Sequence, residues 1–126
     1  MIADLGYSLA EQGRSLEAIT IFEGLAALAP ATSYFQSALG ALWLRTGQPK
    51  RAIAHLDAAL AADSDDVAAM VNRGEAYLQL GDQTTGARDL HAALKRSETL
   101  PPIDAIYVTR TRALLKQIKR LGEANS

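Results

Sequence analysis

The sequence repeats itself with a period of 34 residues, and this repeat limits the possible folds more than any other feature. Two glycines recur in each unit: Gly6, Gly40 and Gly74, then Gly13, Gly47 and Gly81. Apolar or small residues recur in the same register: Leu9, Trp43 and Tyr77; Ala18, Ala52 and Gly86; Phe22, Leu56 and Leu90. A period of about 20 to 50 residues is typical of arrays in which each unit packs on its neighbours. The sequence therefore predicts a stack of three similar units.

Each unit is expected to contain two helices, because its apolar residues recur every three or four positions. Glycines, Pro30 and the run Asp63-Ser64-Asp65-Asp66 supply the helix ends and caps. We predict helices over residues 2–12, 15–28, 32–45, 49–62, 67–80 and 83–96. Gly86 falls inside a helix, where glycine costs about 1 kcal/mol relative to alanine, so we expect the paired helix to approach closely there.

The period is lost after residue 100, and a last helix is predicted over residues 102–121, ended by Gly122. Its apolar residues point toward one side: Ile103, Ile106, Tyr107, Leu114, Ile118 and Leu121. Its other side is basic: Arg110, Arg112, Lys116, Lys119 and Arg120. Such a helix seals the open end of a stack. We expect one domain over residues 1–122, with units at about 1–32, 33–66 and 67–100, and a disordered tail over 123–126.

Composition excludes several classes of function. The 126 residues contain no cysteine, so disulfides and thiolate metal sites are excluded. The net charge is −1, which argues against nucleic-acid binding, although the chain is acidic at its start and basic at its end. Because no apolar run approaches the roughly 18 residues of a spanning helix, we expect a cytoplasmic protein with no membrane insertion.

The repeated residues resemble the tetratricopeptide repeat. In the first unit Leu5 and Gly6, then Gly13, Ala18, Phe22 and Pro30, follow its signature of small and large apolar residues, and Leu9 stands where the signature has an aromatic residue. The resemblance implies an all-α protein, an α-solenoid of three tetratricopeptide helix hairpins with a C-terminal capping helix. Three stretches are similar to the class II translocator chaperones of bacterial type III secretion systems: Tyr7 to Gly13, Ile21 to Leu25, and Phe35 to Ala41.

The resemblance also implies a concave groove that binds peptides, lined by the first helix of each hairpin. By analogy with other tetratricopeptide arrays, the groove residues are Tyr7 and Glu11; Tyr34, Ser37, Ala41, Leu44 and Arg45; and Val71, Glu75 and Leu78, together with Ala3, Ala10, Ala68 and Gln79. The best apolar anchors are Tyr7, Tyr34, Leu44 and Leu78. These side chains suit a protein or peptide segment with apolar anchors. Equally, Tyr7 and Tyr34 could be ordinary surface tyrosines, and Arg45 and Glu75 solvated charges.

Other sites are not indicated. His55 and His91, the only histidines, occupy different repeat positions without a matching carboxylate cluster, so we expect no metal. The aspartate run from Asp63 lacks the glycine and distal glutamate of a calcium loop. Neither a nucleophile beside a base nor a phosphate-binding loop is present, so we expect neither an enzyme nor a cofactor. Tetratricopeptide domains that bind the acidic tails of heat-shock chaperones need a basic clamp, and of its positions only Asn72 matches.

Two hypotheses remain. The first is a non-catalytic module that binds an extended or helical segment of a partner protein in the concave groove, possibly as a type III secretion translocator chaperone. The second is a structural scaffold or self-associating subunit, since apolar surface on an unsealed N-terminal unit favours homo-oligomers.

Overall fold

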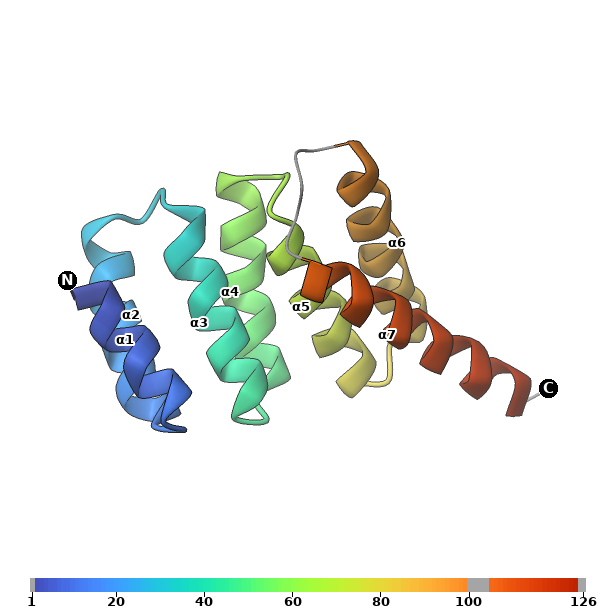
Figure 1. Cartoon of the computed structure of the whole chain (residues 1–126), viewed down its shortest axis with the longest axis horizontal. Coiled ribbons are helices and arrows are strands. Elements are labelled where there is room, and N and C mark those ends of the chain that lie inside the picture. Colours follow the sequence, from blue (N-terminus) through green and yellow to red (C-terminus); the bar gives the residue numbers. More distant parts are fainter. Residues whose placement is uncertain (1, 100–104, 125–126) are drawn as a thin grey trace.

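The computed structural model describes residues 2–99 and 105–124, and within these ranges all regular structure is helical. The helices are α1 (Ile2–Glu11), α2 (Ser15–Leu28), α3 (Ser33–Arg45), α4 (Pro49–Ala62), α5 (Val67–Gln79), α6 (Gln83–Thr99) and α7 (Ala105–Ala124). Consecutive helices pair as antiparallel hairpins that stand side by side, with α7 at the far end from α1 (Figure 1). The predicted all-α solenoid of three hairpins and a C-terminal helix is confirmed.

The same glycine turn closes all three hairpins. Gly13, Gly47 and Gly81 have φ angles of 77°, 77° and 84°, a left-handed conformation that glycine adopts without the steric cost of a Cβ. In each turn the residue after the glycine donates its backbone N–H to a carbonyl five positions back, as Arg14 does to Leu9 at 2.9 Å. This bond ends the first helix of the pair and directs the chain into the second.

The other repeated glycine lets the two helices of each pair pack closely. A Cβ added at Gly6 would lie 2.8 Å from Phe22, and one added at Gly74 would lie 2.8 Å from Leu90. Gly40 stands against Leu56 in the same way. The repeat therefore places a glycine, which has no side chain, on the first helix opposite a large buried side chain on the second helix.

In the third hairpin the second helix also carries a glycine, Gly86, at the contact with the first. A Cβ there would lie 2.9 Å from the carbonyl oxygen of Gly74 and 2.9 Å from Leu78. The close approach predicted for this glycine is confirmed.

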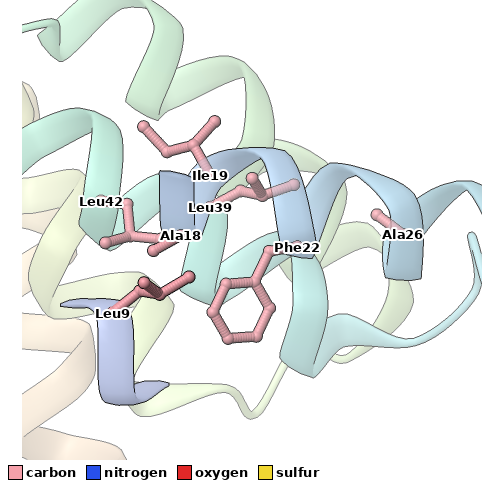
Figure 2. Packing of buried hydrophobic residues seen from close by; sticks show 7 residues of the cluster. All are labelled: Leu9, Ala18, Ile19, Phe22, Ala26, Leu39 and Leu42. Atoms are coloured by element: carbon pink, nitrogen blue, oxygen red, sulfur yellow. The ribbon is translucent and has the colours of Figure 1, made fainter. Parts of the chain in front are cut away.

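Three apolar clusters form a continuous core along the array. Figure 2 shows the first, made by α1, α2 and α3, in which Leu9, Phe22 and Leu39 point toward one another. Trp43 packs against both the first and the second cluster. The third cluster joins α5 and α6 to α7 through Leu114, which is 4% exposed. Each hairpin is thus stabilised by its neighbour.

An ion-pair network links the second and third hairpins. Arg73 on α5 donates two hydrogen bonds to the buried carboxylate of Asp89 on α6, at 2.7 and 2.8 Å. It donates a third, of 3.0 Å, to the exposed Asp57 on α4. These bonds, chiefly those to Asp89, raise the pKa of the Arg73 guanidinium above its ordinary value, so the arginine stays charged.

Two helices of the C-terminal part end later than expected. Helix α6 continues to Thr99, three residues beyond the predicted end. Helix α7 passes through Gly122 to Ala124, so the prediction that Gly122 ends it, and that residue 123 begins a disordered tail, is wrong. A glycine in an exposed last turn costs about 1 kcal/mol, too little to stop the helix without a competing turn. Its predicted start at 102 lies outside the described residues.

The predicted inner face of α7 is correct only in part. Leu114 is buried, and Tyr107 and Ile118 are partly buried. By contrast Ile106 is 66% and Leu121 40% exposed, so assigning these two to the packed face was wrong. The helix packs mainly against α5 and α6, and its C-terminal end reaches past α6 in Figure 1. No helix in the described ranges has the length and apolarity needed to span a membrane.

Candidate functional site

Two adjoining clefts open on the side of the array formed by α1, α3 and α5. The first, called here the tyrosine cleft, has a volume of about 200 Å³ and is lined by Tyr7, Tyr34, Ser37, Ala38, Ala41, Asp66, Ala68, Asn72 and Tyr107. The second, the polar cleft, has a volume of about 390 Å³ and is lined by Ala41, Leu44, Arg45, Asn72, Glu75 and Gln79. Because Ala41 and Asn72 line both, the two form one continuous surface, called here the concave groove.

Three tyrosines from three helices surround the tyrosine cleft. The ring centroids of Tyr7 and Tyr34 are 6.0 Å apart, and Tyr7 also stacks edge-on against Phe22 of the core at 5.2 Å. Tyr34 is 54% exposed, whereas Tyr7 is 36% exposed. Burial, and then a hydrogen bond with Tyr34, raise the pKa of Tyr7 above its ordinary value. Both side chains line the cleft and combine an apolar ring with a polar hydroxyl.

Asp66 helps to shape the floor of the tyrosine cleft. Its carboxylate caps α5 by accepting the backbone N–H of Ala69 at 3.0 Å and also accepts the hydroxyl of Ser33 at 2.7 Å. Ser33 lies at the start of α3, so the bond ties two groove-lining helices together.

The charged side chains of the polar cleft already have partners within the protein. Arg45 donates to the carbonyl oxygen of Ala10 at 3.1 Å, and Arg110 of α7 forms an ion pair with Glu75. Both interactions cross from one helix to another and hold the walls of the groove. The cleft therefore offers neutral amides, from Asn72 and Gln79, beside paired charges, which suits the backbone of a bound peptide better than a single strong charge.

The predicted site residues fall into three groups. Tyr7, Tyr34, Ser37, Ala41, Leu44, Arg45 and Glu75 line the concave groove. Glu11 is exposed but lines neither cleft, and Leu78 packs instead against the third core cluster and Gly86. Val71 is only 1% exposed and belongs to that core cluster, so its assignment to the surface is corrected. Leu44, chosen as an anchor, is 8% exposed and is mainly a core residue.

These exceptions share one feature, which is packing against later helices of the array. Leu44 belongs to the cluster formed with α4 and α5, whereas Val71 and Leu78 pack in the cluster formed with α6 and α7.

The sequence reasoning missed Tyr107 as a groove residue. It was expected to face the array, but the period ends before α7, so no repeat position could indicate that its ring reaches the tyrosine cleft. Asp66 was recognised only as a helix cap. Asn72 was considered only as the one residue that matches the clamp of domains binding the acidic tails of heat-shock chaperones.

The described residues contain no cluster of histidine, cysteine or carboxylate side chains suited to a metal ion. His55 on α4 lies away from the groove, with Nδ1 2.8 Å from Oε1 of Gln36, to which it donates. Burial lowers the pKa of His55 below its ordinary value. The histidine is therefore a packing residue joining α3 and α4.

Sequence comparison gives one family. The family model described as "Tetratricopeptide repeat" matches residues 3–66 and again 44–101. Tetratricopeptide repeat protein 37 of Xenopus laevis is 40% identical over 79 residues, which are 63% of this chain but 5% of that protein. The chain thus spans a small part of this curated relative, and the match concerns the repeats.

Solved structures with the same fold cover nearly the whole chain. The type III secretion translocator chaperone SycD of Yersinia enterocolitica superposes with a TM-score of 0.87 at 24% identity, covering 97% of this chain and 83% of that one. It has also been solved with a peptide of the translocator YopD. PcrH, from Pseudomonas aeruginosa, in complex with the chaperone binding region of PopD, superposes with a TM-score of 0.87 at 21% identity, covering 96% and 90%. At these identities the likeness establishes the fold.

Proposed function

We propose that this chain, which belongs to the tetratricopeptide repeat family, is a non-catalytic module that binds an extended or helical segment of a partner protein in its concave groove. The observation that carries the proposal is the continuity of the tyrosine cleft and the polar cleft through Ala41 and Asn72. A surface with one apolar pocket beside one polar pocket can hold an anchoring side chain and the adjoining backbone of the same segment.

The volumes indicate what kind of segment fits. A tyrosine cleft of about 200 Å³ is of the size of one branched or aromatic side chain rather than of a whole ligand. Tyr34 and Tyr107 supply contact area with few rotatable bonds, so little entropy is lost when they are immobilised. The polar cleft beside them offers amide donors and acceptors to the peptide backbone. The proposed ligand is therefore a segment with an apolar anchor followed by a few uncharged residues.

The narrower proposal is that the partner is a translocator of a type III secretion system, held in the cytoplasm before export. Support comes from the neighbours whose structures include segments of PopD and YopD, and from the similarity of residues 35–41 to that class of chaperones. The acidic tails of heat-shock chaperones are not proposed as ligands. The groove has no free cluster of cations among its described residues, because Arg45 and Arg110 are engaged by Ala10 and Glu75.

The test is a binding titration with labelled peptides. A peptide copying the chaperone binding region of PopD should bind with a micromolar Kd, measured by fluorescence anisotropy, and a YopD peptide should compete with it. An acidic heat-shock tail peptide should bind at least tenfold more weakly. If neither translocator peptide binds but another apolar-anchored peptide does, the narrower proposal fails and the groove proposal stands.

Two matched pairs of variants locate the bound peptide. Tyr34→Ala should weaken binding about tenfold, while Tyr34→Phe, which keeps the ring, should retain most of it. Ala41→Arg fills the junction of the two clefts, and Ala54→Arg places the same side chain on the exposed surface of α4. Equal binding by the two arginine variants, both folded by circular dichroism, would remove the groove as the binding site.

A further inference from the structure

The tyrosine cleft is lined by side chains of two sizes. Its large side chains are three tyrosines from three helices, Tyr7 of α1, Tyr34 of α3 and Tyr107 of α7. The same cleft is lined by four small residues: Ser37, Ala38, Ala41 and Ala68. Because the small residues already leave space, the positions of the three rings determine how large a side chain enters the cleft of about 200 Å³.

Two of the three rings are held by the core of the repeats. Tyr7 lies edge-on against Phe22, with ring centroids 5.2 Å apart, and Tyr34 lies edge-on against Phe35, with centroids 5.8 Å apart. Phe22 is 1% exposed in the first core cluster, and Phe35 packs against the same cluster. Moving either tyrosine would therefore disturb its aromatic contact with the core.

The third ring depends on α7, which lies outside the repeat. Tyr107, Arg110 and Leu114 are spaced three and four residues apart, so they share one face of this helix. Leu114 is buried in the third core cluster, and Arg110 forms an ion pair with Glu75 of α5. The Glu75 side chain is only 20% exposed, so solvent screens this pair less than a fully exposed one. The ion pair, one turn after Tyr107, therefore holds the beginning of α7 beside the groove.

We propose that Tyr107 limits the size of the anchoring side chain, and that the Arg110–Glu75 ion pair positions Tyr107 for this role. The inference rests on the proposed function and narrows its ligand: the anchor is a branched aliphatic or single-ring side chain, and the larger indole of tryptophan is excluded. Tyr107 contacts the anchor itself, whereas Arg110 acts through Glu75 and α7. An oversized side chain can enter only by displacing a wall of the cleft, which lowers affinity.

A series of peptides that differ only in the anchor tests the proposal. The anchor is located in the chaperone binding region of PopD, or in an apolar-anchored peptide that binds more tightly, as the position where alanine lowers affinity most. Leucine, phenylalanine and tryptophan are then placed there. The selectivity is the Kd of the tryptophan peptide divided by the Kd of the leucine peptide, both measured by fluorescence anisotropy.

Three variants change the wall of the cleft. Tyr107→Ala removes the ring, Tyr107→Phe keeps it as the matched control, and Tyr107→Trp enlarges it. Circular dichroism would check that each variant is folded.

The expected result is a change of selectivity rather than of affinity alone. The unmodified chain and Tyr107→Phe should bind the leucine peptide about tenfold more tightly than the tryptophan peptide. Tyr107→Ala should reduce this ratio to about threefold or less, because the space left by the phenol admits the indole. Tyr107→Trp should instead weaken the phenylalanine peptide relative to the leucine peptide. Equal weakening of every peptide by Tyr107→Ala, or an unmodified chain without selectivity, would overturn the proposal.

The ion pair is tested by its effect on the same selectivity. Arg110→Met should lower the selectivity about threefold. Arg112→Met should leave it unchanged, since Arg112 is an exposed arginine of α7 that makes no salt bridge in the part of the chain described. Exchanging the charges, with Glu75→Arg and Arg110→Glu together, should restore the selectivity lost in each single variant. A charge exchange that restores nothing would remove the positioning role.

The same measurements separate this inference from the proposed function. If no peptide binds the unmodified chain, the proposed function fails and this inference fails with it. Peptide binding that the Tyr107 variants weaken without a change of selectivity contradicts this inference alone.

Discussion

The hairpin interiors and the concave groove use the repeat in opposite ways. Inside the hairpins, positions 34 residues apart keep one chemistry: Gly6, Gly40 and Gly74 each face a large buried side chain. In the groove, positions 34 residues apart differ completely, as Tyr7, Ala41 and Glu75 show. The positions that recur determine how the helices pack. The positions that do not recur determine what the surface can bind.

This difference predicts that stability and binding can be changed separately. Interior side chains are close-packed, so truncating them leaves a cavity that the neighbours fill only in part. Groove side chains face solvent on one side and lose less when they are shortened.

The largest effect is expected from the second hairpin interior. Leu56 is fully buried against Gly40, and Leu56→Ala should lower the free energy of unfolding by about 2–5 kcal/mol. Leu28→Ala is the control, because Leu28 is 83% exposed, and it should change stability by less than about 0.5 kcal/mol. Denaturant unfolding followed by circular dichroism measures both. Similar losses for the two variants would contradict the assignment of Leu56 to the interior.

The next effect concerns the link between hairpins. Asp89→Asn removes the charge that accepts two bonds from Arg73 and should cost about 1–3 kcal/mol of unfolding free energy. Asp57→Asn removes the other bond, but the Asp57 side chain is 56% exposed, so its loss should be below about 1 kcal/mol. A loss of unfolding free energy for Asp57→Asn as large as that for Asp89→Asn would contradict the stronger role assigned to Asp89.

Tyr7 contacts both the hairpin interior and the concave groove. Its variants therefore test whether stability and binding can be changed separately. Its ring contacts Phe22 in the interior and Tyr34 in the groove. Tyr7→Ala should therefore lower both peptide affinity and stability, the latter by about 1 kcal/mol from the lost aromatic pair. Tyr34→Ala should lower affinity with a smaller loss of stability. Unfolding and peptide binding would be measured on both variants. A larger loss of stability for Tyr34→Ala than for Tyr7→Ala would contradict the comparison.

The smallest effect is a pH dependence at the α3–α4 contact. Burial lowers the pKa of His55 in the folded protein. In the unfolded chain the pKa has its ordinary value of about 6.5, so the unfolded chain binds the proton more tightly. Protonation thus lowers stability as the pH falls from 7 to 5, partly offset by the nearby Glu23. His55→Gln should reduce this loss, measured as unfolding midpoints at several pH values. An unchanged pH profile would exclude His55 as its source.

The helices could be predicted almost completely from the sequence. The 34-residue register and the three hairpin glycines determine the helix starts and ends from α1 to α5 within a residue or so, because each local signal occurs three times. Helix α7 has no second copy to compare with, and the sequence misplaced its end at Gly122. Local signals are weaker when nothing repeats them.

The groove could be predicted only in part. Tyr34 and Ala41 follow from their place on the first helix of the second hairpin. Whether Leu44 and Val71 are surface or core depends on how α4 to α7 pack against their helices, and the residue pattern of α3 or α5 alone does not indicate that packing. Tyr107 enters the groove from outside the repeat, so only the three-dimensional path of α7 reveals it.

The central claim, that the concave groove binds the peptide, is tested most directly by mapping the contact residue by residue. Backbone amide chemical shifts would be followed by NMR while the PopD chaperone binding peptide is added. The account predicts that the largest changes fall at Tyr34, Ala41, Asn72 and Glu75, with little change on the outer face of α4. Changes concentrated on α2, α4 and α6, or in the cleft between α6 and α7 lined by Leu115 and Ile118, would contradict it.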